Sequence, residues 1–411
     1  MKQILLILAF SSLLVSCSGS GGSTAIPFDD GTAAAAATMS GNNVVPLQIG
    51  SSGTLNVPVA TVTVCSLGNT SQCVTIPNIL IDTGSSGLRV FSSFLTGLSL
   101  TQVTDGSGNS IARCVNFGDG TNQWGPVKKA TVIIGGETVS SVNIEVIDAS
   151  YKTVPSHCNG AESSPSDYNG ILGVGTRDQD CGSSADCTQA NNNGWYFTCT
   201  SGSSTCTDTG AALNLQVENP IALMDTTANV DGIDDSGGSS IILPSIPDSG
   251  VLSASGYLVF GIGTRSNNTP SNSAKVLTTN SEGYFYTTYD GTSFIPSLLD
   301  SGSNAFFFPA TSSSPNTCSG GWYCPDSTVT LNATHKAYTG GASYSTSFDV
   351  IDMRRAFVSN NSAYPSDGAE EDSMFIWGLP YFYGRQVYTS IYGKTVTING
   401  TTYTTSPVVA Y

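Results

Sequence analysis

The chain has 411 residues with 14 lysines and arginines against 30 aspartates and glutamates, a formal charge of −16 with only 11% charged residues. This acidity argues against nucleic acid as a partner, because phosphate binding relies on clustered basic side chains. Two histidines are too few for a multi-histidine metal centre, and we expect no metal and no cofactor. Apolar residues make up 39% of the chain, enough for a large core, and the length predicts two domains.

The first 17 residues resemble the signal peptide of a bacterial lipoprotein. Lys2 precedes an apolar run from Ile4 to Val15 that is too short to span a membrane. The run ends in Leu-Val-Ser-Cys, which is similar to a lipobox, so Cys17 would become the lipid-bearing residue. The alternative is an ordinary secreted protein with a chance cysteine. We expect export and lipid anchoring of Cys17 in the bacterial cell envelope, at the outer membrane and facing the periplasm or the surface. Residues 18–43 read as a flexible tether.

Ten further cysteines, an even number, favour five disulfides in an oxidising compartment. Sequence does not fix their connectivity. Four pairs are close enough to be local clips, which would leave Cys114 with Cys158; the four are Cys65/Cys73, Cys181/Cys187, Cys199/Cys206 and Cys318/Cys324. The rival interpretation is a zinc site, but the chain has no C-x-x-C motif.

From Val44 onward the chain consists of short stretches rich in Val, Ile, Thr and Tyr, separated by Gly, Asn, Ser and Pro, which predicts an all-β protein. Residues 57–81 read as a disulfide-clipped hairpin, and residues 130–147 as a second hairpin. Residues 178–210 have little apolar periodicity and read as a stapled surface insertion. The aspartate-rich residues 229–235 lack a full calcium-loop pattern, so we expect a solvated loop there.

One short motif occurs twice. Residues 80–86 read Leu-Ile-Asp-Thr-Gly-Ser-Ser, and residues 298–304 read Leu-Leu-Asp-Ser-Gly-Ser-Asn. Each copy is an apolar strand that delivers one carboxylate into a tight, hydroxyl-lined loop. An apolar-apolar-glycine segment follows each copy, at residues 170–173 and 375–378. The two halves of the chain therefore share a plan.

With this repeat, the chain resembles the pepsin-like aspartic peptidases. The resemblance runs from Val44 to Tyr411 and implies an all-β, bilobal pepsin-like double β-barrel with the active cleft between the lobes, residues 44–250 forming the N-terminal lobe and residues 251–411 the C-terminal lobe. Further matching segments are residues 169–175, 256–261 and 376–382. The chain also looks like an uncharacterised family of bacterial lipoproteins of unknown function, through the Cys65/Cys73 hairpin, Leu88-Arg89 and residues 259–268.

Two carboxylates held about 3 Å apart cannot both ionise, so Asp82 and Asp300 would share one proton as a catalytic dyad. The ionised member would activate a water, and the protonated member would donate to the developing oxyanion. Gly84 and Gly302 would let the backbone turn sharply beside the carboxylates. By resemblance, Ser85 and Ser303 would hydrogen-bond the aspartates, and Thr83 and Ser301 would cross-brace the two loops. For both aspartates the plainer interpretation is a turn cap at a strand end.

The family also closes a hairpin flap over its substrate, which here corresponds to residues 116–121, including Phe117, Gly118, Asp119 and Gly120. Phe117 takes the place of the usual flap tyrosine and lacks its hydroxyl. Arg89 takes the place of the tryptophan that usually partners this tyrosine. Arg89 would depress the pKa values of the dyad or bind an acidic substrate group, and the alternative is a solvent-facing arginine.

These observations favour a lipid-anchored aspartic endopeptidase that cleaves polypeptides and contacts the membrane through Cys17. The altered flap motivates an alternative, a non-catalytic lipoprotein that binds a peptide or protein in its cleft. A carbohydrate-active enzyme is a third alternative, but it needs its two carboxylates at least about 5 Å apart.

Overall fold

The structure is a computed structural model that describes residues 32–50 and 53–411. It is 42% strand and 7% helix, with a closed six-stranded barrel and a half-barrel, which confirms the all-β class. The expected signal peptide, Cys17 and residues 18–31 lie outside the described residues. No helix of the described residues is long and apolar enough to cross a membrane.

The closed barrel is built from the first half of the chain. Its apolar interior includes Val62, Ile81, Leu88 and Ile144, all 0% exposed. Both predicted hairpins are present: one is clipped where Cys65 pairs with Cys73, and the other turns at Gly135-Gly136. Around the barrel the strands follow the order β3 (Pro58–Ser66), β4 (Asn69–Asp82), β10 (Gly170–Val174), β5 (Ser86–Phe91), β9 (Glu137–Ile147) and β8 (Asn122–Ile134), which pairs back with β3.

A seven-stranded sheet in the second half repeats part of this arrangement. Strand β17 pairs in parallel with β22, β22 pairs antiparallel with β18, and β18 pairs in parallel with β21. The barrel strands β4, β10, β5 and β9 pair with one another in the same order and directions. An aromatic cluster fills it, in which Phe375 stacks on Trp377 at a ring-centroid distance of 4.6 Å. In order across the sheet the strands are β20 (Ser343–Val350), β19 (Val329–Lys336), β16 (Phe285–Tyr289), β17 (Thr292–Leu299), β22 (Phe375–Trp377), β18 (Phe306–Phe308) and β21 (Gly368–Glu370).

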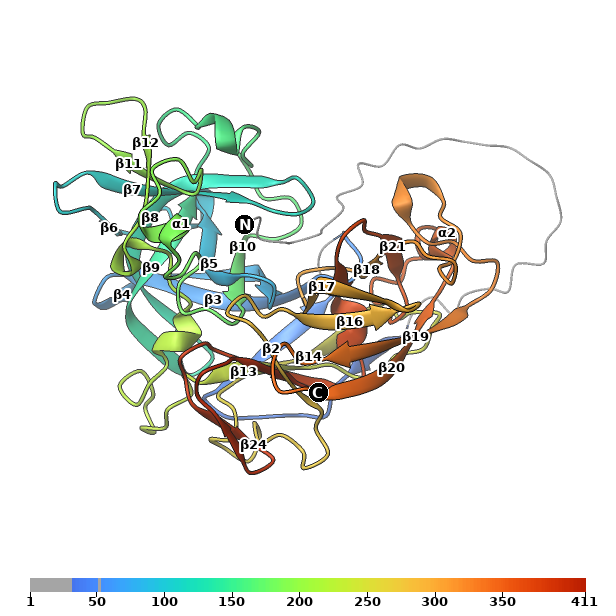
Figure 1. Cartoon of the computed structure of the whole chain (residues 1–411). Coiled ribbons are helices and arrows are strands. Elements are labelled where there is room, and N and C mark those ends of the chain that lie inside the picture. The colour runs from blue at the N-terminus through green and yellow to red at the C-terminus, as the bar shows by residue number, and fades with distance from the viewer. Residues whose placement is uncertain (1–31, 51–52) are drawn as a thin grey trace.

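Strands from both ends of the chain pair between these two units. In Figure 1, β2, β13 and β14 lie between the barrel on the left and the seven-stranded sheet on the right. Strand β14 pairs with both β2 and β13, so pairing crosses the expected boundary at residue 250. These strands are β2 (Val44–Ile49), β13 (Gly238–Ile242), β14 (Ser253–Phe260), β15 (Val276–Thr278), β23 (Gln386–Ser390) and β26 (Val408–Ala410).

The described end of the expected tether belongs to this sheet. Strand β1 (Ala33–Ala35) pairs in parallel with Ser253–Ser255 of β14, and the Ala36 amide donates to the Ser255 carbonyl at 2.9 Å. The expectation that the tether continues to residue 43 is therefore wrong for Ala33–Ala35, because this short alanine run adds an edge strand.

The expected insertion at 178–210 also joins the structure more closely than its composition indicated. Its strand β11 (Tyr196–Cys199) pairs with β7 (Ser110–Asn116), and Tyr196 is 0% exposed. The remaining strands are β6 (Thr101–Gln102), β12 (Thr207–Thr209), β24 (Val396–Ile398) and β25 (Thr401–Tyr403). The α-helices are α1 (Ala185–Thr188) and α2 (Met353–Ala356), and short 3₁₀ helices lie at Ser92–Phe94, Ser156–Cys158, Leu213–Leu215, Pro220–Leu223, Ser319–Gly321 and Leu379–Phe382.

Five disulfides staple the loops and hairpins. The four short-range pairs and the remaining long-range pair are all formed, which confirms the pairing that sequence proximity favoured: Cys65–Cys73, Cys114–Cys158, Cys181–Cys187, Cys199–Cys206 and Cys318–Cys324. Three of the bridges hold the region around β7 and β11. This region borders the candidate site.

Candidate active site

The two repeated aspartates lie at corresponding places in the two halves. Asp82 ends β4, where its Cα is paired with Gly173 of the parallel strand β10. Asp300 directly follows β17, and its amide donates to the Trp377 carbonyl of the parallel strand β22 at 2.9 Å. Both carboxyl groups are fully buried. In each half, a parallel strand pair therefore delivers one carboxyl group to the end of a buried strand.

The structure brings these two carboxyl groups together. A Cβ atom added to Gly84 would lie 2.7 Å from both Cγ and Oδ1 of Asp300, so only glycine allows the first loop to approach the second aspartate this closely. The carboxyl groups of Asp82 and Asp300 hydrogen-bond to each other. A carboxyl–carboxyl hydrogen bond requires one proton, which is the arrangement expected of a dyad.

Equivalent hydrogen bonds hold the two aspartates. The Gly84 amide donates to Asp82 Oδ1 at 2.8 Å, and the Gly302 amide donates to Asp300 Oδ1 at 2.9 Å. The hydroxyl of Ser85 donates to Asp82 Oδ2, and that of Ser303 donates to Asp300 Oδ2 at 2.7 Å. The serine contacts expected by resemblance are thus present in both loops.

Thr83 and Ser301 link the two loops through four reciprocal hydrogen bonds. The Thr83 hydroxyl donates to the Leu299 carbonyl at 3.0 Å and accepts from the Ser301 amide at 2.9 Å. The Ser301 hydroxyl donates to the Ile81 carbonyl at 2.8 Å and accepts from the Thr83 amide at 3.1 Å. All these groups are buried, so the brace fixes the relative position of the two aspartate loops.

The glycines of the apolar-apolar-glycine segments support the loops by close packing. A Cβ atom on Gly173 would lie 2.7 Å from Ser85 Oγ, and one on Gly378 would lie 2.6 Å from the Ser303 carbonyl oxygen. A larger residue would clash with Ser85 and Ser86 in the first loop, and with the carbonyls of Ala305 and Ser303 in the second. This contact explains why both segments end in glycine.

Burial and the neighbouring charge set the ionisation of the pair. Burial raises the pKa of Asp300 well above its ordinary value, and repulsion from Asp82 raises it further. Burial also raises the pKa of Asp82, but the hydrogen bonds from Ser85, Asp300 and Gly84 oppose that rise. The two shifts belong to the pair, which can hold a single proton and so offers a base and an acid side by side.

Arg89 is buried, so the solvent-facing alternative is wrong. Its guanidinium is 0% exposed, with Nε 3.3 Å from Glu145 and Nη2 3.1 Å from Asp180. Its charge lowers the pKa of Asp82, as one of the two expected roles requires, although this is the smallest of the named influences on Asp82. Two carboxylates already hold the guanidinium away from solvent, which argues against its other expected role of binding a substrate acid.

The network around Arg89 continues beneath the site. Asp180 also accepts from Arg113 Nε at 2.6 Å and from the Tyr196 hydroxyl at 2.5 Å. Burial raises the pKa of Glu145 to about 7, although Arg89 and Arg113 oppose the rise. Within the described residues, no group of three or more His, Cys, Asp or Glu side chains is arranged to hold a metal ion.

The hairpin expected to be a flap connects β7 and β8, but its aromatic residue is not available to a ligand in this conformation. Phe117 is 1% exposed and packs with Leu80, Tyr168 and Ile171. Asp119 is a turn former that accepts from the Thr121 amide at 2.8 Å, and Gly118 and Gly120 are exposed at the tip.

Trp124 of β8 is also buried, and its indole packs edge-on against Phe197 at 5.2 Å. The ring of Phe117 lies in the apolar cluster that contains Leu80, and its contact with a substrate stays a prediction.

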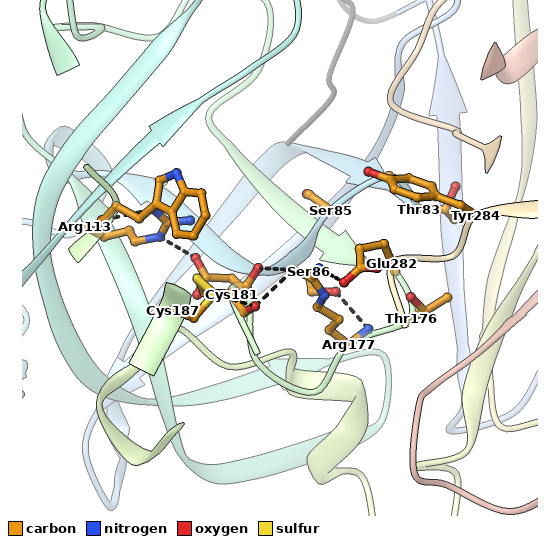
Figure 2. Close-up of a pocket in the computed structure, with 14 residues that line it drawn as sticks. Thr83, Ser85, Ser86, Arg113, Thr176, Arg177, Cys181, Cys187, Glu282 and Tyr284 are labelled. Atoms are coloured by element: carbon orange, nitrogen blue, oxygen red, sulfur yellow. Dashed lines mark hydrogen bonds and ion pairs between the residues drawn. A yellow bond between two sulfur atoms is a disulfide. The ribbon is translucent and has the colours of Figure 1, made fainter. Parts of the chain in front are cut away.

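A cavity of about 50 Å³ borders the first aspartate loop. Its wall includes Thr83, Gly84 and Ser85 of that loop together with residues that sequence reasoning did not select for the site: Ser86, Arg113, Thr176, Arg177, Asp180, Trp195 and Glu282. Tyr284 lines it as well. Figure 2 shows Arg177 and Glu282 reaching toward each other below Ser85 and Tyr284. No sequence signal joins Arg177 to Glu282, because they lie 105 residues apart.

Comparison with known families matches residues 39–411 to a family described as "Protein of unknown function (DUF3443)". The chain belongs to this family, which covers the barrel, the seven-stranded sheet and both aspartate loops. No curated protein matches the chain significantly.

Proposed function

We propose that this protein is an aspartic endopeptidase that hydrolyses peptide bonds with Asp82, Asp300 and an activated water. The main support is the direct contact between two buried carboxyl groups supplied by equivalent loops. Such contact favours a shared proton. It disfavours glycoside hydrolysis, which needs carboxyl groups at least about 5 Å apart.

In the proposed reaction Asp82 is the base and Asp300 the acid, because repulsion from Asp82 adds to the rise in the pKa of Asp300, whereas hydrogen bonds oppose the rise at Asp82. Asp82 takes a proton from the water as the water oxygen attacks the peptide carbonyl carbon, and Asp300 donates its proton to the carbonyl oxygen. The tetrahedral intermediate then collapses: Asp82 passes its proton to the departing nitrogen, and Asp300 recovers a proton from the intermediate. The Thr83–Ser301 brace keeps both carboxyl groups in place throughout.

The proposal includes a pepsin-like arrangement with lobes at residues 44–250 and 251–411 and a cleft between them. The repeated strand pattern around β4 and β17 supports it. It also includes a lipid anchor on Cys17, which would hold the enzyme in the bacterial envelope with polypeptides as substrates.

The test is digestion of an unfolded protein by the purified full-length chain between about pH 3 and pH 7, which covers the mildly acidic range in which a dyad holds a single proton. Asp82→Asn and Asp300→Asn should each abolish cleavage. Asp326→Asn is the matched control, because Asp326 is fully exposed and should tolerate the change. Cleavage that survives in both dyad variants would refute the mechanism.

A non-catalytic peptide-binding role is the second candidate, and one observation favours it: Phe117, at the position of the flap aromatic residue, is buried in an apolar cluster with Leu80 and Ile171. If the wild-type chain cuts nothing at any pH and pepstatin does not stabilise it, this second function replaces the first.

A further inference from the structure

The cavity beside the dyad brings arginines together in a strongly acidic protein, each of them paired with a carboxylate. The chain has a net charge of −16 and only seven arginines, yet Arg113 and Arg177 line this cavity and Arg89 lies directly behind it on Asp180. Arg89 and Arg113 share the single carboxylate of Asp180. Since burial raises the pKa of Glu145 to about 7, this nearby carboxyl group becomes neutral in mild acid and leaves the cluster more positive.

The guanidinium of Arg177 is held in place largely by uncharged acceptors. Its Nη1 donates to the carbonyls of Asp180 at 3.3 Å and Cys181 at 3.1 Å, and its backbone amide donates to Ser86 Oγ at 3.2 Å. These contacts come from the same half of the chain and position the group at the cavity wall. Its carboxylate partner is Glu282, through Nη2.

Glu282 is suited to act as an exchangeable counter-ion. It lies on the turn before β16, in the second half of the chain, where Ser281 Oγ donates to it at 3.0 Å. The side chains of Arg177 and Glu282 are 16% and 20% exposed, whereas that of Asp180 is 0% exposed. A carboxylate entering from solvent can therefore replace Glu282 on Arg177, while Arg113 remains paired with buried Asp180.

We propose that this cavity binds a carboxylate of the peptide substrate, with Arg177 as the receiving group and Glu282 as the counter-ion that it displaces. The inference rests on the proposed peptidase function, because the cavity shares Thr83, Gly84 and Ser85 with the dyad loop. The carboxylate has two possible sources: an aspartate or glutamate side chain near the scissile bond, or the free C-terminus of the peptide. The first source gives an endopeptidase selective for acidic sequences, and the second directs cleavage to chain ends.

The test uses peptide binding to the full-length Asp82→Asn chain at about pH 5.5, where peptide carboxylates are ionised. Labelled hexapeptides carry aspartate at successive positions, each with an asparagine twin, and every peptide is made with a free and with an amidated C-terminus. Fluorescence anisotropy gives the Kd of each. We expect the preferred carboxylate to tighten binding about tenfold over its neutral twin, as for a hydrogen bond to a charged group. The aspartate arm and the C-terminal arm identify the source.

Two further substitutions, each made in the Asp82→Asn chain, test whether Arg177 and Glu282 cause the preference for a carboxylate. Arg177→Gln should remove the discrimination between acid and neutral twin, and Glu282→Gln should increase it, because the competing carboxylate is gone. A gain in Glu282→Gln cannot come from misfolding. Arg354→Gln is the matched control, because this arginine is 58% exposed on α2 and should leave the ratio unchanged.

Equal binding of acid and neutral twins, no binding by any peptide, or discrimination that survives Arg177→Gln would each overturn the inference. Failure of the peptidase proposal looks different. In that case carboxylate-selective binding persists while the wild-type chain cleaves nothing. Cleavage by the wild type without carboxylate selectivity would refute this inference but not the peptidase proposal.

Discussion

A second buried carboxyl pair, Glu137 with Asp235, provides the sharpest quantitative prediction. Glu137 begins β9, is 0% exposed and contacts Asp235, which Arg265 and Thr264 already hold at 2.7 and 2.6 Å. Burial, together with the hydrogen bond with Asp235 and repulsion from its charge, raises the pKa of Glu137 to about 9. Glu137 is therefore protonated at neutral pH. Asp231 also pairs with Arg265, so the expected solvated loop is in part a buried ion-pair cluster.

The raised pKa of Glu137 makes stability depend on pH in a defined direction. Between its unfolded value of 4.5 and its folded value of about 9, the native state holds a proton that the unfolded chain has lost. The free energy of unfolding should therefore fall as pH rises, by about 1.4 kcal/mol per pH unit from this group. Over two pH units the loss is roughly 3 kcal/mol. Glu137→Gln keeps the shape but cannot ionise, so it should remove this part of the slope.

Urea denaturation at pH 6, 7 and 8 measures the effect. The free energies of wild type and Glu137→Gln should diverge with rising pH, with the variant relatively more stable at pH 8. Glu370→Gln, at an exposed glutamate, is the control and should run parallel to wild type. If the wild-type and Glu137→Gln values change in parallel across the three pH values, the buried carboxyl pair does not titrate as argued.

Three further predictions concern the candidate site and its supports. Thr83→Val should lower the free energy of unfolding, measured by urea denaturation, by about 3 kcal/mol, because it leaves the Ser301 amide and the Leu299 carbonyl without partners. A double-mutant cycle with Ser301→Ala should show strong coupling between the two residues, and additive effects would contradict the reciprocal brace. Removing the Cys114–Cys158 bridge by double alanine substitution should lower stability by roughly 4 kcal/mol, more than removing a bridge of separation 6, because the closed loop is longer; an equal loss for both would refute this ranking. Asp300→Asn should flatten the fall in stability with rising pH, because the raised pKa of Asp300 keeps a proton in the native state that the unfolded chain releases; an unchanged pH profile of unfolding would contradict it.

Local patterns explain why much of the site was predictable. The strand that carries Asp82 and the loop after it are encoded in one short motif, and the second copy around Asp300 repeats the same chemistry. The resemblance to a known family then indicated the Thr83–Ser301 contact, which the structure contains. Gly84 was expected to allow a sharp turn, but its closest constraint is the Asp300 carboxyl group across the interface.

Residues whose role depends on distant partners were not predictable in the same way. From the sequence alone, the side chain of Arg89 could face either solvent or the interior. It is buried because the tertiary structure places Glu145 and Asp180 against β5, where they pair with its guanidinium. The Phe117 ring was expected to face a cleft, but in the structure it is buried against Leu80 and Ile171. Sequence does not show this packing, because these residues are far from Phe117 along the chain.

The sequence by itself determined the all-β class, the hairpins, the two aspartate loops and a disulfide pairing consistent with short spacing, because each depends on residues that are neighbours along the chain. Only the tertiary structure decided that the two carboxyl groups touch, that Arg89 is buried and that Arg177 meets Glu282 across a cavity. These contacts join residues 56 to 218 positions apart, and their geometry depends on how the barrel and the seven-stranded sheet approach each other and on packing within each.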